Sequence, residues 1–220
     1  MKNHFVLFDL DGTITDSSEG IINSILYALK KMGKEESDFS RLRSYVGPSL
    51  KTTFQNHYFP LEEDSNKAIA YYREYYAKKG IYENRLYSGI YDVLKEIKGN
   101  GGIIALATAK PTYFAKIILK HFEIMDCFDV VVGSHLRGTR TQKDEIIFEV
   151  LDQLGFPDSR EVFMVGDREY DIIGGKHHRL KTIGVNYGYG TEGELFKVRP
   201  DYIVKSPFEI LDCIKLFTNQ

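Results

Sequence analysis

Two pairs of acidic residues could do chemistry together, because each pair directly follows a short apolar run. Asp9 and Asp11 follow one run, and Asp167 and Asp171 follow another. While the backbone stays extended, side chains two residues apart leave it on the same face, and residues four apart lie one helical turn from each other. Close carboxylates do not all ionise readily without a cation. Either a divalent metal lies between them or the pKa of one carboxyl rises, and both outcomes are useful in catalysis.

A set of carboxylate oxygens favours a hard cation. Mg²⁺ typically takes one or two carboxylates together with substrate phosphate and water. We therefore expect a Mg²⁺ site built from the four acidic residues Asp9, Asp11, Asp167 and Asp171, and a small phosphorylated molecule as the partner. The competing interpretation is structural, in which Asp11-Gly12 forms a turn and Asp9 or Asp167 caps a helix. Two such pairs in one chain favour the metal site.

A phosphate beside several carboxylates needs hydrogen-bond donors and positive charge. Thr108 follows a third apolar run, where free backbone N–H groups at the start of the next helix can cradle phosphate oxygens. Lys143 is the best placed ammonium, and Lys110 and Arg140 are weaker rivals. Gly12 allows a sharp exit and a close approach of the backbone to a ligand. Taken alone, Lys143 would be a solvated residue at a helix start, so its role depends on the other motifs.

The elements that must position these residues follow from the apolar runs. The runs are rich in Val and Ile and do not alternate with polar residues, as in strands buried on both faces of a parallel sheet. They are Phe5 to Phe8, Ile103 to Ala107, Val130 to Val132, Val162 to Val165, Thr182 to Val185 and Tyr202 to Val204. Helical patterns lie over Tyr91 to Ile97, Pro111 to His121, Lys143 to Leu154 and Pro207 to Leu216. This alternation predicts an α/β fold with an open Rossmann-like parallel sheet, which binds ligands at the carboxyl ends of its strands.

One long stretch after the first strand carries helical patterns only. Its first apolar stripe stops at Gly33, where the chain can take a left-handed turn. Asp64 or Ser65 is expected to cap a second long helix that ends near Gly80. We therefore expect a catalytic core of residues 1–15 and 86–220 and an inserted all-helical domain of residues 16–85.

The composition excludes several classes of function. The 29 Lys and Arg against 31 Asp and Glu give a net charge of −2, so no global field attracts nucleic acid or an anionic membrane. Every apolar run is far shorter than the about 20 residues of a bilayer span. The scattered Cys127 and Cys213, and the lack of a signal-peptide pattern, favour a cytoplasmic location. We expect a monomer or a homodimer.

Together these motifs resemble those of the haloacid dehalogenase superfamily of phosphatases. Asp9-Leu-Asp11-Gly12-Thr13 is similar to the first motif of the family, Thr108 to the second, Lys143 to the third and Gly166-Asp167-x-x-x-Asp171 to the fourth. The helical insertion after the first motif is similar to the family's type 1 cap. Tyr45-Val-Gly-Pro48, Gly166-Asp167-Arg168 and Gly184-Val-Asn-Tyr-Gly-Tyr-Gly190 resemble the phosphoglycolate phosphatase branch. The third motif lacks the proline of the common Lys-Pro form, and Arg168 stands where many relatives carry Thr or Ser.

The resemblance implies hydrolysis of a phosphate monoester through an aspartyl-phosphate on Asp9. Asp11 would protonate the leaving alkoxide and then take a proton from the hydrolytic water. Mg²⁺ would be held by Asp9, Asp167 and the main-chain carbonyl of Asp11, with Asp171 supporting a metal-bound water or Lys143.

The resemblance also implies which residues contact the substrate. Thr108 and Lys143 would stabilise the transferring phosphoryl group, beside Ala109, Lys110 and Gly12, while Thr13 would support the loop that positions Asp11. The cap would close over the site, with Arg43 as the candidate for a substrate carboxylate or second phosphate.

Three other functions compete with the phosphatase. A phosphotransferase similar to β-phosphoglucomutase would use the same core residues and pass phosphate to a sugar hydroxyl. A dehydrogenase is a formal rival because Gly188-Tyr-Gly190-Thr-Glu-Gly193 matches the dinucleotide fingerprint. The helix behind that match would be very short, and no acidic residue ends the next strand. A non-catalytic binding module is disfavoured because every motif position is filled.

Overall fold

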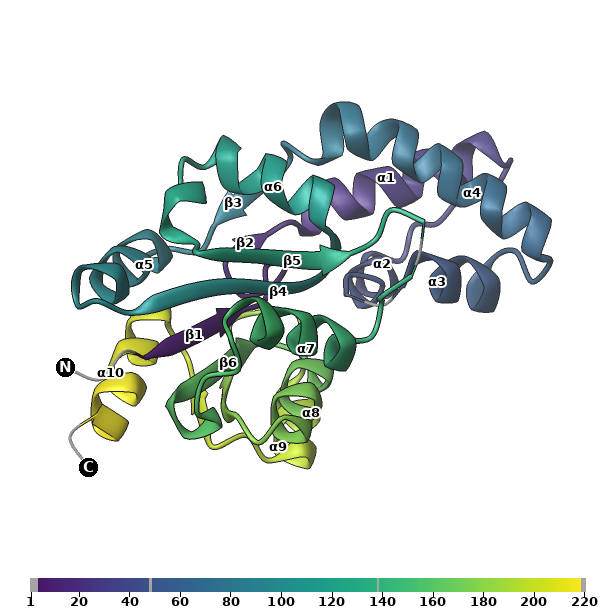
Figure 1. The fold of residues 1–220 in the computed structure, drawn as a ribbon. Helices are drawn as coiled ribbons and strands as arrows, with labels where there is room; N and C mark the ends of the chain where they lie inside the picture. Colours follow the sequence, from purple (N-terminus) through teal and green to yellow (C-terminus); the bar gives the residue numbers. More distant parts are fainter. Residues whose placement is uncertain (1–3, 48, 138, 219–220) are drawn as a thin grey trace. The chain divides into compact units, whose positions relative to one another are not determined.

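The chain forms two compact units in a computed structural model that describes residues 4–47, 49–137 and 139–218. The first unit is Met1–Thr15 with Leu86–Gln220, and the second is Asp16–Arg85. The first unit is therefore discontinuous in sequence and the second is continuous. Each is described by itself below (Figure 1).

A six-stranded parallel sheet forms the centre of the first unit, with the strand order β5-β4-β1-β6-β7-β8. The strands are β1 (Phe5–Phe8), β4 (Ile103–Pro111), β5 (Val130–Ser134), β6 (Val162–Gly166), β7 (Lys181–Val185) and β8 (Tyr202–Val204). The predicted α/β parallel-sheet fold is confirmed. β4 and β5 extend past their apolar runs, because pairing with a neighbouring strand continues where the side chains turn polar. β1 lies between β4 and β6, so whatever follows these three strands meets at one edge of the sheet.

Among the described residues, six α-helices belong to this unit, and several of them pack against the sheet through apolar stripes. They are α5 (Ile90–Gly99), α6 (Thr112–His121), α7 (Lys143–Gln153), α8 (Glu169–His177), α9 (Glu192–Val198) and α10 (Pro207–Thr218). The stripe of α7 consists of Ile146, Ile147 and Val150, which are buried against Leu7 of β1 and Met164 of β6 among others. Each buried aliphatic side chain contributes roughly 1.5–3 kcal/mol. This packing fixes the start of α7, and with it Lys143, beside the first strand.

The second unit is helical apart from its ends. Its helices are α1 (Ser18–Lys31), α2 (Phe39–Ser44), α3 (Leu50–His57) and α4 (Glu62–Tyr75), and a π-helical turn follows over Tyr76–Gly80. α1 packs along α4 and the π turn (Figure 1). Gly20 and Gly80 allow this close approach, since a side chain at Gly20 would collide with the carbonyl oxygen of Gly80. Two-residue strands, β2 (Thr15–Asp16) and β3 (Arg85–Leu86), pair where the chain enters and leaves the unit.

The structure corrects the predicted start of the second long helix. Neither Asp64 nor Ser65 caps it, because α4 begins at Glu62 after Leu61. Asp64 lies within the first turn, where a carboxylate stabilises the positive end of the helix dipole as effectively as it would from the cap. The Ser65 hydroxyl donates to the carbonyl of Glu62. The α-helix also ends earlier than predicted, at Tyr75, and only the π turn reaches Gly80.

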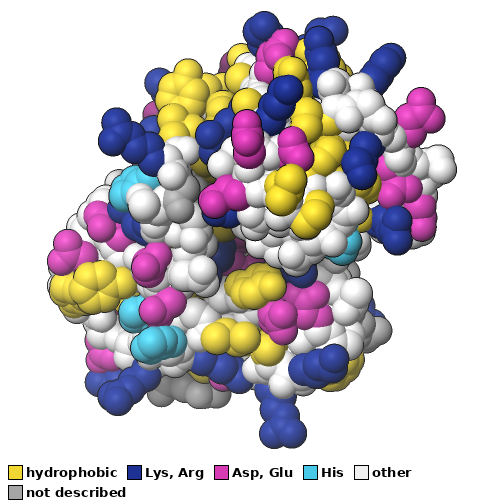
Figure 2. Space-filling view, turned by 90° about the vertical axis from the view of Figure 1, so that its right-hand side faces the viewer, with side chains coloured by type: hydrophobic (Ala, Val, Ile, Leu, Met, Phe, Trp, Pro, Cys, Tyr) yellow, Lys and Arg dark blue, Asp and Glu magenta, His cyan; other side chains and the backbone are white. Residues whose placement is uncertain are grey.

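Surface features agree with the balanced composition. On the face that Figure 2 displays, Lys and Arg side chains are interspersed with Asp and Glu. Among the residues that the structure describes, no helix combines the length and the apolar character that crossing a bilayer requires.

Candidate active site

Three buried aspartates from two neighbouring strands form the centre of the site. Asp9 directly follows β1, Asp167 directly follows β6, and Asp171 lies in the first turn of α8. One carboxylate oxygen of each lies within 4.8 Å of the others. The backbone N–H of Asp9 donates to the carbonyl of Val165 at 2.9 Å, which continues the pairing of β1 with β6 past the strand end. Parallel pairing in register thus brings the two acidic pairs of the sequence together.

Lys143 joins this cluster from the first position of α7. Its ammonium lies 2.8 Å from Asp9 Oδ1 and 2.7 Å from Asp171 Oδ1, and donates to the carbonyl of Ala107 at 2.9 Å. The residue is only 8% exposed, so it is not the solvated helix-start residue of the structural interpretation. Burial opposes its charge, but Asp171 and Asp9 outweigh burial and raise the pKa of Lys143 above its ordinary value.

One ammonium does not offset the cost of burying three carboxylates together. Burial is the main cause that raises the pKa of Asp9 to about 6, and Asp171 raises it further while Lys143 lowers it. Burial also raises the pKa of Asp167 well above its ordinary value, with Asp171 and Asp9 adding to the effect. Protons are therefore held in this site at pH values where an exposed carboxyl is ionised.

A loop after β7 holds Asp167 through the backbone. The N–H groups of Tyr189 and Gly190 lie 2.7 and 3.3 Å from Asp167 Oδ2. A side chain at Gly188 would collide with Asp167 and with the carbonyl of Gly12, so the loop can approach only because glycine stands there. Close approach to Asp167 accounts for Gly188 and Gly190, two of the three glycines that resemble a dinucleotide fingerprint. Sequence reasoning missed the role of the loop, since a missing side chain does not indicate which partner will approach.

The donor set fits a hard divalent cation. Asp167 Oδ1 is buried and has no hydrogen-bond partner among the described residues, although Oδ2 has two donors. An orphaned carboxylate oxygen beside two further buried carboxylates suits Mg²⁺. Asp9, Asp167 and Asp171 are the side chains that would hold it.

Asp11 has a different partner. Its Oδ2 lies 2.8 Å from the ammonium of Lys110, and its carboxylate is not part of the buried acidic group. The turn that carries it depends on Gly12, which has a φ of 88° and would strike Asp167 if it bore a side chain. The Gly12 N–H donates to the carbonyl of Thr15, and the Tyr187 hydroxyl donates to that of Thr13. The two carboxylates of the first motif therefore leave β1 toward separate cations.

Three candidate substrate-binding residues lie at the end of β4. Thr108 is buried, and its hydroxyl accepts from the N–H of Lys110 at 3.2 Å. Ala109 is exposed.

The two candidate arginines lie elsewhere in the chain. Arg140, the other rival to Lys143, donates instead to the carbonyl of Gly133 and lies 3.4 Å from Glu149. Arg43 is exposed on α2 of the second unit.

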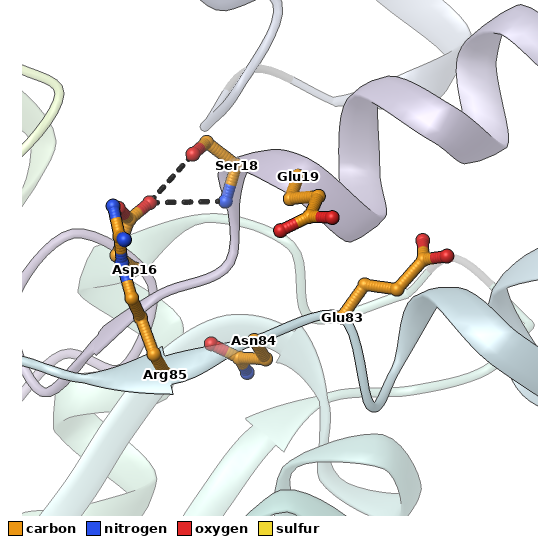
Figure 3. A pocket seen from close by; sticks show the side chains of 6 residues that line it. All are labelled: Asp16, Ser18, Glu19, Glu83, Asn84 and Arg85. Atoms are coloured by element: carbon orange, nitrogen blue, oxygen red, sulfur yellow. Dashed lines mark hydrogen bonds and ion pairs between the residues drawn. The ribbon is translucent and has the colours of Figure 1, made fainter.

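A small polar pocket belongs to the second unit alone (Figure 3). It has a volume of about 100 Å³ and is lined by Asp16, Ser18, Glu19, Glu83, Asn84 and Arg85. Asp16 accepts from the N–H and hydroxyl of Ser18 and pairs with Arg85 at 2.7 Å. Glu83 accepts from Asn23 and Tyr75. Asp16 and Glu83 thus serve the hydrogen bonding of this unit.

Comparison with known proteins agrees with the fold. The haloacid dehalogenase-like hydrolase family model matches residues 6–185. A 5′-nucleotidase of Pseudomonas aeruginosa is 40% identical over 197 residues, which cover 90% of this chain and 89% of that protein. The crystal structure titled a predicted phosphatase from Clostridium acetobutylicum has a TM-score of 0.90 and 43% identity, and covers 97% of this chain and 99% of that chain. The tyrosine-protein kinase PtkA of Mycobacterium tuberculosis is 35% identical over 91% of this chain, which spans 65% of that longer protein.

The chain belongs to the haloacid dehalogenase-like hydrolases. It is an enzyme of the phosphatase class within that family. The dehydrogenase alternative is thereby excluded, and so is the non-catalytic binding module. The helix behind the glycine motif, α9, spans only seven residues, as the sequence argument against a dinucleotide site requires.

Proposed function

We propose that the protein is a Mg²⁺-dependent hydrolase of small phosphate monoesters that works through an aspartyl-phosphate on Asp9. The observation that supports this most strongly is the placement of the Lys143 ammonium 2.8 Å from Asp9, beside a buried aspartate with a free oxygen. Bound Mg²⁺ would supply charge neutralisation between the nucleophilic carboxylate and the phosphate dianion. Lys143 and Thr108 would donate to the oxygens of the transferring group.

The reaction divides into two half-reactions. In the first, an oxygen of Asp9 attacks phosphorus, the bond from phosphorus to the ester oxygen breaks, and Asp11 gives its proton to the departing alkoxide. In the second, Asp11 takes a proton from water, the resulting hydroxide attacks phosphorus, and the bond to Asp9 breaks. Asp11 ends each cycle protonated as it began.

The second unit is proposed to serve as the family's type 1 cap. Arg43 is its candidate for a substrate carboxylate or a second phosphate, because guanidinium binds such groups through two parallel hydrogen bonds. This assignment is tested by the Arg43→Gln variant, which should raise KM for substrates that carry a carboxylate or a second phosphate more than for a simple alkyl phosphate.

The substrate class is proposed to be small metabolites with one terminal phosphate. The sequence motifs favour a phosphoglycolate-like compound, and the relative with 40% identity is named a 5′-nucleotidase, so both classes belong in a substrate panel. A phosphotransferase is a second candidate, because a relative with 35% identity is named a protein kinase. Release of inorganic phosphate without an added acceptor favours the hydrolase, and turnover that requires an acceptor hydroxyl favours the transferase.

The Asp9→Asn variant tests the nucleophile. It should lose activity by at least about 10⁴-fold, because an amide does not attack phosphorus. Asp92→Asn, at an exposed position of α5, is the matched control and should keep wild-type activity. Acid quenching of the wild type with ³²P-labelled substrate should leave label on the peptide that contains Asp9. Retention of more than a few per cent of activity in Asp9→Asn, or label on another residue, would refute the assignment.

A further inference from the structure

A second ion pair, largely shielded from solvent, lies beside the nucleophile. The Lys110 ammonium is 2.8 Å from Asp11 Oδ2, and the two side chains are only 7% and 15% exposed. Exposed ion pairs contribute little, whereas a shielded pair holds both of its groups in one geometry. The sequence assigned Lys110 to the substrate, but the structure places its charge on the carboxylate that is proposed to carry the proton.

The backbone of Lys110 is held from two sides. Its N–H donates to the Thr108 hydroxyl, which closes a short turn at the end of β4. On β5, a side chain at Gly133 would collide with the carbonyl of Lys110, so the two backbones lie in close contact there. Gly133 is itself held, because its carbonyl accepts from the guanidinium of Arg140 and its N–H donates to Thr112. The backbone from which the Lys110 side chain extends is therefore held in place by its neighbours.

The two lysines of the site contact different aspartates. Lys143 lies on Asp9 and Asp171, at 2.8 and 2.7 Å, whereas Lys110 lies on Asp11. Asp11 is carried on a turn after β1, and this turn is held mainly by backbone hydrogen bonds among residues 10–15. A carboxylate on such a turn has several rotamers open to it. In the structure the carboxylate takes a rotamer in which Oδ2 faces the Lys110 ammonium.

We propose that Lys110 is a positioning residue that orients the Asp11 carboxyl for proton transfer to and from the leaving oxygen. This inference rests on the proposed function and deepens it. Lys110 keeps its own proton throughout the cycle. In the first half-reaction the bond from phosphorus to the ester oxygen breaks as the Asp11 proton moves to that oxygen. In the second half-reaction the proton of the attacking water returns to Asp11.

The leaving group distinguishes this role from phosphate binding. An alkoxide is a strong base and depends on the proton from Asp11, whereas p-nitrophenolate leaves readily without one. The value of kcat/KM reports only the steps up to the first half-reaction. A misplaced Asp11 therefore lowers kcat/KM for alkyl esters selectively, whereas a lost phosphate contact lowers it for both kinds of ester equally.

The experiment compares Lys110→Met, Lys110→Arg and the wild type in Mg²⁺, with Lys116→Met at an exposed position of α6 as the control. The aryl ester is p-nitrophenyl phosphate. The alkyl ester is phosphoglycolate or adenosine 5′-monophosphate, whichever the wild type hydrolyses faster. For Lys110→Met we expect kcat/KM to fall about 10-fold to 100-fold with the alkyl ester and less than about threefold with the aryl ester, because general acid catalysis contributes about 10²–10⁴-fold in total. Lys110→Arg should recover part of the loss, and the Ki for inorganic phosphate should stay within about twofold in all variants.

Each other outcome overturns the inference. An equal loss with both esters, accompanied by weaker phosphate inhibition, assigns Lys110 to phosphate binding. No loss with either ester shows that Asp11 does not need the contact. If Lys110→Met melts well below the wild type, Lys110→Arg alone decides, and a uniform loss in that variant counts against the role. Wild-type protein that releases phosphate from neither ester overturns the proposed function itself, which is a distinct result.

Discussion

The Lys143 ammonium lies between two buried carboxylates. These contacts determine how much stability the protein loses when the positive charge is removed. Lys143→Met should destabilise the fold by about 3–5 kcal/mol, because it leaves Asp9 and Asp171 buried without a counterion. Chemical denaturation measures this loss. Part of it should return in the double variant Lys143→Met/Asp171→Asn, and Lys116→Met should be neutral. A single variant as stable as the wild type would show that these carboxylates are not ionised together.

The raised pKa values at the site predict how magnesium binding depends on pH. Because burial raises the pKa of Asp9 to about 6 and that of Asp167 also rises, protons occupy these carboxyls in mild acid and compete with the cation. The stabilisation by Mg²⁺ should therefore be lost as the pH falls through about 6. Melting temperatures with and without MgCl₂ should differ more at pH 7.5 than at pH 5. Equal shifts at both pH values would contradict the metal assignment, and Asp9→Asn should flatten the dependence.

At the scale of residues, sequence reasoning could locate the chemical groups and named Lys143 as one possible partner of Asp171, but it did not pair Lys110 with Asp11. The four aspartates, Thr108 and Lys143 all follow apolar runs or begin apolar stripes, and that pattern is visible without a structure. Which ammonium faces which carboxylate depends on side-chain packing between distant segments. Lys110 is separated from Asp11 by almost a hundred residues, and nothing in its neighbourhood indicates that partner.

The loop after β7 provides a prediction at the scale of elements. Gly188→Ala should displace the loop, because the added carbon would collide with Asp167 and with the backbone at Gly12, and the Tyr189 N–H would leave Asp167. The Mg²⁺ concentration for half-maximal activity should rise about 10-fold to 100-fold, as when other groups that orient metal ligands are changed. Gly193→Ala is the matched control from the same motif, since none of the described residues beyond its own helix places an atom within 4 Å of the added carbon. The same response in both variants would exclude the positioning role of the loop.

Strands and helices were predictable where an apolar pattern is long and regular. All six runs of the predicted sheet correspond to strands, and the four helical patterns of the core correspond to α5, α6, α7 and α10. The short pair β2 and β3 carries no such pattern, because two residues are too few to show a period. The start of α4 was misplaced because acidic residues are favourable both at a cap and in the first turn.

At the scale of the whole molecule, magnesium should act on the first unit. All the proposed ligands and both ammonium groups belong to residues 1–15 and 86–220. Hydrogen exchange with added Mg²⁺ should slow in the segments 9–13, 166–171 and 187–190, because ligand binding raises the free energy of local opening. Exchange in α1 and α4 should be unchanged. Equal slowing in both units would show that the cation acts elsewhere.

Sequence reasoning could predict more about the function of the first unit than about that of the second. The core could be predicted from the alternation of apolar runs with helical patterns and from its motifs. The cap role and the contribution of Arg43 stay predictions, since an exposed cation on a short helix fits many ligands. Substrate choice depends on such residues and not on the sheet, so it requires the substrate panel.

The central position of β1 affects how the chain folds during its synthesis. β1 is synthesised before its two neighbours in the sheet, β4 and β6, which begin about 100 and 160 residues further along the chain. At about 5–20 residues per second, the nascent strand waits roughly 10 to 30 seconds for its second partner. During that interval Phe5, Val6, Leu7 and Phe8 are an uncovered apolar segment. Newly synthesised chains are therefore expected to depend on chaperones more than refolding chains, in which all strands are available at once.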